Sequence, residues 1–173
     1  MPDPLLTKHG ESQCAALAAS FPHTERITHL VASPLRRTIL TALLSFPSLV
    51  EPPKSLKIVT VPELQETSDA PCDTGSAPEA LEQEQWAGKV DLSRVKEGWN
   101  DKSASSPWSP APQKVEARAV VSRRFLQELG QEYEERTGQE AHIAVSSKRR
   151  AGSKIPLTAD EERELASIGG LKN

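Results

Sequence analysis

The spacing of apolar residues predicts four alternating elements in the first part of the chain. Residues 7–20 and 34–46 carry apolar side chains at the three- and four-residue intervals that form one face of an α-helix. Residues 28–32 form a short, mainly apolar run, and residues 57–61 alternate with β-branched side chains, as buried strands do. The order helix, strand, helix, strand is typical of an α/β protein with a mostly parallel sheet flanked by helices.

Loop-forming residues dominate much of the second part of the chain. Residues 68–78 and 100–112 are rich in proline, serine and other turn formers, and loops of this length are usually functional or disordered. Between them the pattern predicts a short acidic helix over residues 79–86. A long amphipathic helix over residues 114–136 and a third strand over residues 141–145 follow.

Size and composition favour one domain with an appended tail. The chain has 173 residues, of which 36% are apolar and 14 are proline, so part of it should be irregular. We expect an α/β domain over residues 1–146. A divergent, charged tail follows over residues 147–173, with a short helix beginning near Thr158.

Charge and cysteine content exclude several classes of protein. Lysine and arginine number 21 against 24 acidic residues, a net charge of −3 that gives no overall footprint for nucleic acid. No apolar run reaches the length of a membrane span, and no signal peptide is evident, so we expect a cytoplasmic protein. The two cysteines are far apart and lack metal-ligand spacing, so neither a metal site nor a redox pair is suggested.

Candidate chemistry follows the two strands that are predicted first. The pair Arg36–Arg37 lies just after one strand, and Glu63 and Glu66 lie just after the next. Because parallel strands end at one edge of a sheet, an arginine and a carboxyl group should meet there. Such a pair suits phosphate-monoester chemistry, in which the phosphoryl oxygens need a cation and the leaving oxygen needs a proton. Taken separately, the arginines are more typical of a solvated basic pair and the glutamates of ordinary exposed carboxylates, and only their joint placement favours a site.

A second segment invites a different interpretation. Cys72 begins the run Cys-Asp-Thr-Gly-Ser, which is similar to the phosphate loop of cysteine phosphatases. That loop needs an arginine six positions after the cysteine, where this chain has Pro78. Without the guanidinium that would hold the phosphate oxygens, the segment does not favour a cysteine nucleophile.

Several motifs together resemble one family. The segment over residues 3–13 matches Leu-Thr-x-x-Gly-x-x-Gln, and residues 32–41 match Ser-x-Leu-x-Arg-[Ala/Thr]-x-x-Thr. Residues 62–66 contain Leu-x-Glu, and residues 71–76 continue as in one branch of the family. Over residues 3–145 the chain therefore resembles the histidine phosphatase superfamily, the phosphoglycerate-mutase-like proteins, and most closely a branch common in fungi.

The resemblance implies a phosphomonoesterase or mutase-like activity that uses phosphohistidine chemistry. It implies that Arg37 is the second phosphate-binding arginine and that Glu66 is the proton donor to the leaving group. The ligand would be a phosphorylated small molecule or another phosphomonoester. No cofactor is implied.

The sequence departs from the family pattern at both histidines. The family's Arg-His-Gly strand precedes the segment with which this chain begins, so we expect an N-terminally truncated domain with an incomplete sheet that a partner could complete. Ser147 stands where the second histidine should follow the last strand.

One local sequence resembles the missing motif. Lys8-His9-Gly10 differs from Arg-His-Gly only by its lysine, but Pro2 and Pro4 argue against a strand before it. A lysine also lacks the planar fork of arginine. We therefore expect His9 to be an exposed residue in the first turn of a helix.

Three hypotheses follow. The chain is part of a working phosphomonoesterase, or it is an inactive module that binds phosphate or protein. In the third, Lys148–Arg150 and the charged tail bind nucleic acid. This hypothesis is the least favoured, because acidic residues over 160–162 lie close by in the sequence.

Overall fold

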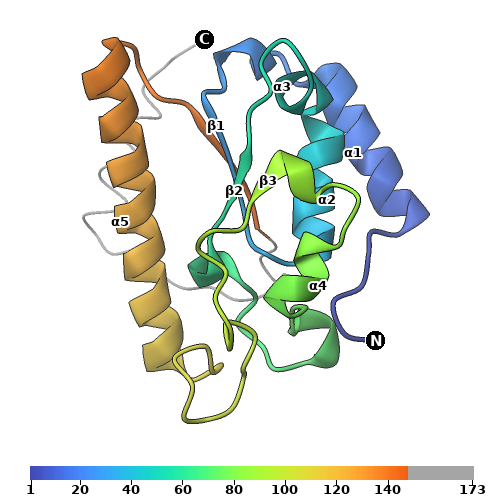
Figure 1. Ribbon diagram of the computed structural model, residues 1–173, viewed down its shortest axis with the longest axis vertical. Coiled ribbons are helices and arrows are strands. Elements are labelled where there is room, and N and C mark those ends of the chain that lie inside the picture. Colours follow the sequence, from blue (N-terminus) through green and yellow to red (C-terminus); the bar gives the residue numbers. More distant parts are fainter. Residues whose placement is uncertain (148–173) are drawn as a thin grey trace, which may run out of the picture.

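The protein is a four-stranded parallel sheet with helices on both faces, as a computed structural model describes it for residues 1–147 (Figure 1). The strands are β1 (His29–Ala32), β2 (Ile58–Thr60), β3 (Val90–Asp91) and β4 (Ile143–Ser146). Their order is β3-β2-β1-β4, and each neighbouring pair is parallel. The α/β class with a mostly parallel sheet, predicted from the alternation of elements, is confirmed.

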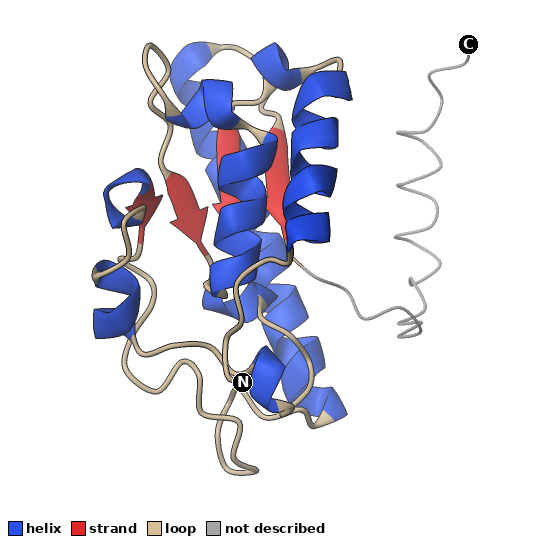
Figure 2. Ribbon diagram, turned by 90° about the vertical axis from the view of Figure 1, so that its right-hand side faces the viewer, coloured by secondary structure: helices blue, strands red, loops and turns tan. Residues whose placement is uncertain are grey.

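Helices cover the two faces of this sheet unequally. The α-helices are α1 (Lys8–Ser20), α2 (Arg36–Ser45), α3 (Pro47–Val50), α4 (Pro78–Glu82) and α5 (Pro112–Thr137). The long α5 lies along one face, whereas α1 and α2 lie on the other (Figures 1 and 2). Short 3₁₀ turns connect the elements at Thr24–Arg26, Pro62–Leu64, Pro71–Asp73 and Ala87–Lys89.

The core forms where β1 and β2 meet α2. Leu30 of β1 pairs with Ile58 of β2, and both are completely or almost completely buried. Leu35 and Ile39 from the start of α2 belong to the same buried cluster, together with Trp99 from an irregular segment. Burying these side chains holds the carboxyl ends of the two strands in a fixed relation to the first turn of α2.

Most of the predicted elements are present, with local differences. Thr7 caps α1, and its hydroxyl accepts a hydrogen bond from the backbone N–H of Gly10 at 3.1 Å. Pro34 was expected inside the first helical turn, but α2 begins at Arg36 because Leu35 still has extended backbone angles. The acidic helix is shorter than expected and ends at Glu82. The two-residue strand β3 was not predicted.

Some expectations concern residues beyond the described part of the chain. The basic run Lys148–Arg150 and the helix expected near Thr158 lie outside residues 1–147. Within residues 1–147, no helix has the length and apolar character needed to cross a membrane.

Candidate functional site

Arg37 lies in the first turn of α2, just beyond the carboxyl end of β1. The connection between strand and helix is short and is fixed by Thr38. The hydroxyl of Thr38 donates to the backbone carbonyl of Ser33 at 2.6 Å or to that of Leu35 at 2.7 Å. This turn sets the direction in which the Arg37 side chain leaves the helix.

The guanidinium of Arg37 meets two carboxylates. Its Nη2 lies 3.2 Å from Oε1 of Glu66 and 3.0 Å from Oδ1 of Asp73, and its Nη1 donates to the carbonyl of Cys72. Arg37 is only 8% exposed and Glu66 only 6%. The interpretation as a solvated arginine and an ordinary exposed carboxylate is therefore wrong for these two residues.

The neighbouring Arg36 has a different environment. Its guanidinium forms an ion pair with Glu84 at 2.5 Å, and both side chains are partly exposed. Its backbone N–H donates to Oδ1 of Asp3 at 2.9 Å, while Oδ2 of Asp3 accepts from the backbone and the hydroxyl of Ser76. Asp3 thus ties the N-terminal segment to α2 and to the loop after Asp73.

The backbone around Glu66 is held by two cations. Lys102 donates from Nζ to the carbonyl of Glu66 at 2.8 Å, and Arg118 of α5 donates from Nη1 to the carbonyl of Gln65 at 3.3 Å. Burial lowers the pKa of Lys102 to about 8, helped by Arg118 and opposed by Asp73 and Glu66. Burial also lowers the pKa of Arg118. These two residues fix the segment that carries the Glu66 carboxylate.

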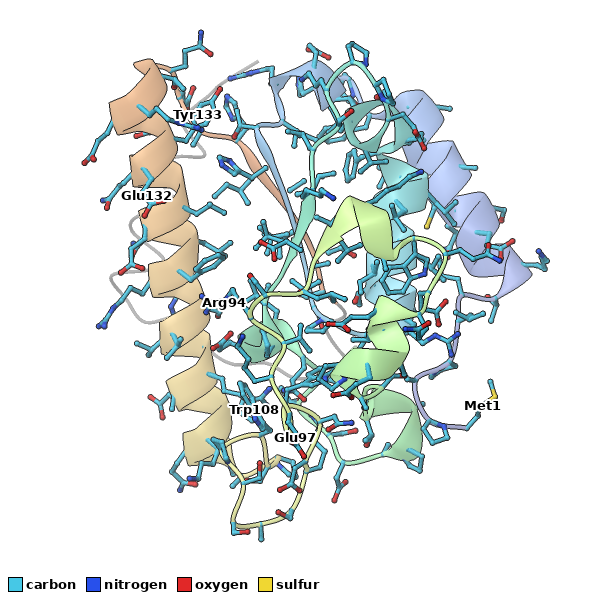
Figure 3. The ribbon with its side chains drawn as sticks, viewed as in Figure 1. Met1, Arg94, Glu97, Trp108, Glu132 and Tyr133 are labelled. Atoms are coloured by element: carbon cyan, nitrogen blue, oxygen red, sulfur yellow. The ribbon has the colours of Figure 1, made fainter. Side chains whose placement is uncertain are left out.

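The second candidate carboxylate, Glu63, points elsewhere. Its Oε2 lies 3.7 Å from Nη2 of Arg94, and the Arg94 guanidinium lies 4.3 Å from the ring centroid of Phe125 on α5. Figure 3 shows Arg94 beside α5. The structure therefore brings Glu66, and not Glu63, to Arg37.

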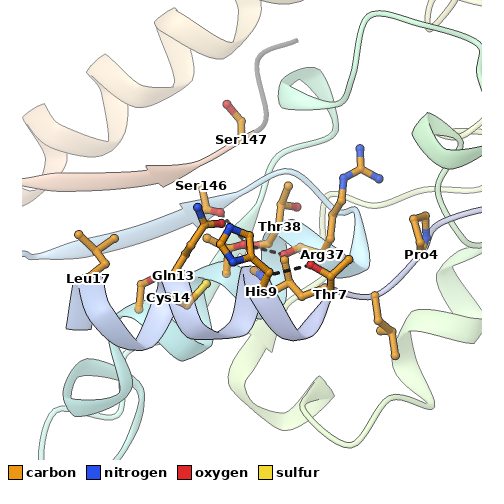
Figure 4. A pocket seen from close by; sticks show the side chains of 15 residues that line it. Pro4, Thr7, His9, Gln13, Cys14, Leu17, Arg37, Thr38, Ser146 and Ser147 are labelled. Atoms are coloured by element: carbon orange, nitrogen blue, oxygen red, sulfur yellow. Dashed lines mark hydrogen bonds between the residues drawn. The ribbon is translucent and has the colours of Figure 1, made fainter. Parts of the chain in front are cut away.

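A cavity of about 620 Å³ adjoins Arg37 (Figure 4). Its walls are the N-terminal segment and α1, the start of α2, and the end of β4 with Ser146 and Ser147. His9 lines the same cavity from the first turn of α1 and is exposed, as expected. In Figure 4 the guanidinium of Arg37 points away from the ring of His9.

The other three histidines lie at the opposite edge of the sheet or before it. His29 begins β1, His142 immediately precedes β4, and His23 precedes the turn that leads into β1. Burial, assisted by the charge of Arg136, lowers the pKa of His29. Because Arg37 and Glu66 follow the carboxyl ends of parallel strands, these histidines are separated from them by the length of the sheet.

No group of three or more histidine, cysteine or acidic side chains within residues 1–147 is arranged as metal ligands are. The Cys72 thiol is free and exposed, 3.7 Å from Oδ1 of Asp73. Cys72 therefore contributes its backbone carbonyl, and not its sulfur, to the surroundings of Arg37.

Comparison with protein-family profiles assigns this chain to a superfamily. The profile of the histidine phosphatase superfamily (branch 1) matches residues 1–151. The chain belongs to the histidine phosphatase superfamily. Comparisons with curated proteins and with solved structures found no match. The parallel sheet and its flanking helices agree with the fold of this superfamily.

The sequence of this histidine phosphatase superfamily member indicates only some of the residues around Arg37. Their positions after two predicted strands pointed to one of Arg36 and Arg37 and one of Glu63 and Glu66, and the family resemblance singled out Arg37 and Glu66. Asp73 was noticed only as part of the segment over residues 71–76. Lys102 and Arg118 gave no sequence signal, because their positions depend on how an irregular segment and α5 pack against Glu66.

Proposed function

We propose that this chain binds phosphate monoesters through Arg37, with Glu66 beside the ester oxygen, and that its own residues do not turn the ester over. The observation that carries the proposal is the buried Arg37–Glu66 pair at the carboxyl ends of β1 and β2, next to a cavity of about 620 Å³. Membership of a superfamily whose substrates are phosphomonoesters supports the choice of ligand.

The guanidinium of Arg37 suits this role. Its planar fork can hold two oxygens of one phosphoryl group through charge-assisted hydrogen bonds. The hydroxyls of Ser146 and Ser147 border the cavity and could donate to further oxygens. Glu66 could donate a proton to the ester oxygen where that oxygen lies within hydrogen-bond distance of its carboxyl group.

The ligand must compete with a carboxylate that already contacts Arg37. Asp73 is the one more easily displaced, because its side chain is more exposed than that of Glu66 and it ends the short 3₁₀ turn Pro71–Asp73. A phosphate dianion next to two carboxylates is repelled by both. We therefore infer that Asp73 leaves the guanidinium when the ester binds.

Turnover through a phosphohistidine needs a histidine in line with phosphorus. His23, His29 and His142 lie toward the other edge of the sheet, and the guanidinium of Arg37 points away from His9. The alternative, a working phosphomonoesterase, requires a nucleophile at the cavity. His9 is the candidate that the described residues offer for it.

Isothermal titration with inorganic phosphate and with p-nitrophenyl phosphate tests the binding site. Arg37→Lys keeps a charge beside Glu66 and Asp73 but removes the fork, and Arg36→Lys is its matched control on the next residue. A charged hydrogen bond is worth about 1.5–3 kcal/mol, so Arg37→Lys should weaken binding about tenfold or more. Arg36→Lys should bind as the wild type does, and Asp73→Asn should bind more tightly. Equal affinities for the two lysine variants would contradict the assignment of Arg37.

Release of p-nitrophenol tests the second half of the proposal. We expect no release above the rate without protein. Release that Glu66→Gln slows would overturn the proposed inactivity while supporting the position of Glu66. Release that His9→Ala abolishes would identify His9 as the nucleophile.

A further inference from the structure

Helix α5 buries few of its side chains. Among its 26 residues only Arg118, Ser122 and Gly130 are buried, and their spacing puts them on one side of the helix. This side packs on the turn Pro62–Leu64 and on residues 141 and 143. The opposite side, here called the outer face of α5, points away from the other helices and strands of residues 1–147 (Figure 1).

Two adjacent valines lie on the outer face of α5. Val120 is 46% exposed and Val121 is 47% exposed, and Ala117, one turn before them, is exposed as well. A β-branched side chain lowers the propensity to form a helix, so helix stability alone does not favour valine at two exposed positions. Contacts within residues 1–147 leave both valines half-exposed. The pair is therefore an apolar centre that a second molecule could cover.

Exposed charges of alternating sign flank the two valines. Lys114 and Glu116 come before them in α5, and Arg124 and Glu128 come after them. None of these four side chains belongs to an ion pair among residues 1–147. Lys114 and Glu128 lie nearly equally far from the valines, and so do Glu116 and Arg124. Each of these two pairs combines opposite charges.

A second copy of the chain complements this pattern when its α5 runs antiparallel. Around a two-fold axis at the valines, a residue that precedes them contacts the residue that follows them at the same distance in the other copy. Lys114 of each copy then faces Glu128 of the other, and Glu116 faces Arg124. A parallel alignment would instead place every charge opposite its own copy, which is repulsive.

We propose that two copies of this chain associate through the outer faces of α5, antiparallel about Val120 and Val121. The valines of both copies exclude water at the centre, and the flanking ion pairs set the antiparallel direction. A contact made by one helix from each copy is small, as in weak and reversible complexes, so the dimer forms as the concentration rises. It leaves free the cavity beside Arg37, to which α5 contributes no residue.

Sedimentation velocity of the full chain tests the association. Between about 5 µM and about 500 µM, the average sedimentation coefficient should rise from that of a monomer toward that of a dimer. Replacing both valines, Val120→Ser with Val121→Ser, should weaken the dimer about tenfold or more, because apolar side chains of both copies leave the contact. Leu44→Ser is the matched control, since Leu44 is 40% exposed but lies on α2. This control should associate as the wild type does.

An exchange of charges tests the antiparallel pairing. Glu116→Arg puts an arginine opposite Arg124 on both sides of the axis and should weaken the dimer about tenfold. Arg124→Glu should have the same effect. The double variant restores opposite charges in reversed order and should associate as the wild type does. Glu79→Arg on α4 changes the net charge as Glu116→Arg does, and as the matched control it should leave the association unchanged.

Three results would overturn the proposal. The first is a full chain that stays monomeric over this range of concentration. The second is a dimer that neither the serine variant nor Glu116→Arg weakens, because the copies would then meet elsewhere. The third is a double variant that associates no better than Glu116→Arg alone. Far-ultraviolet circular dichroism shows that each variant is folded, and the charge exchange stands alone if the serine variant is not. None of these results depends on phosphate binding by Arg37.

Discussion

The surroundings of Lys102 disfavour the positive charge of its side chain. It is half-buried, donates to the carbonyl of Glu66 at 2.8 Å, and has its pKa lowered to about 8 by burial and by Arg118. Asp73 and Glu66 favour the charged form but do not compensate for the loss of water. Because its pKa is still about 8, Lys102 is mostly protonated near neutral pH and donates to the segment that ends at Glu66.

This environment predicts a pH dependence of stability. Between about pH 8 and the ordinary value of 10.5, Lys102 is neutral in the folded chain and protonated in the unfolded chain. The unfolded state then binds more protons, so the free energy of unfolding that Lys102 contributes rises with pH across this interval. Urea unfolding at about pH 7 and about pH 9.5 should show this rise in the wild type but not in Lys102→Met. An equal rise in both proteins would contradict the lowered pKa.

At the scale of elements, the loop after Asp73 packs directly on an aromatic ring. A Cβ on the buried Gly75 would lie 2.1 Å from Cη2 of Trp99. The indole cannot move away easily, because its Nε1 donates to the carbonyl of Ser76 at 3.0 Å. Glycine is therefore required here by close contact and not by an unusual backbone angle.

Gly75→Ala should destabilise the protein, since forcing extra volume into a packed core costs about 1–3 kcal/mol. Gly88→Ala is the matched control, because nothing lies within 4 Å of the position that its Cβ would take. The control should change the free energy of unfolding little or raise it by up to about 1 kcal/mol. The urea concentrations at which the two variants are half unfolded measure the difference in stability directly. Similar losses in both variants would show that Trp99 does not constrain the loop.

The elements that sequence could predict are those whose pattern is local. The periodicity of α1, α2 and α5 and the apolar runs of β1, β2 and β4 follow from the side chains of each segment alone. With two residues, β3 is too short to carry a period. That an arginine and a carboxyl group meet followed from topology, because both come after parallel strands, whereas the choice of Arg37 and Glu66 came from the family resemblance. Asp73 and Lys102 could not be predicted, since irregular segments place them.

At the scale of the whole molecule, those irregular segments are part of the core. The side chain of Gln65 donates to the carbonyl of Trp99 at 2.9 Å, and Asn100 donates to the carbonyl of Gly75 at 2.8 Å. Trp99 itself is only 1% exposed and belongs to the same apolar cluster as Leu30. The segments around Glu66, Gly75 and Trp99 therefore hold one another and the sheet together, although their composition suggested loops.

If this is so, the loops and the sheet should unfold as one unit. All three tryptophans lie between residues 86 and 108, so fluorescence reports the irregular part, whereas far-ultraviolet circular dichroism reports mainly the helices. In urea the two signals should have the same midpoint. Trp99→Ala should lower the free energy of unfolding by about 3–5 kcal/mol and move both midpoints together, because the cavity lies in a shared core. A fluorescence transition at lower urea than the helical transition would mean that the segment carrying Trp99 opens by itself, and that Glu66 and Arg37 are held together without it.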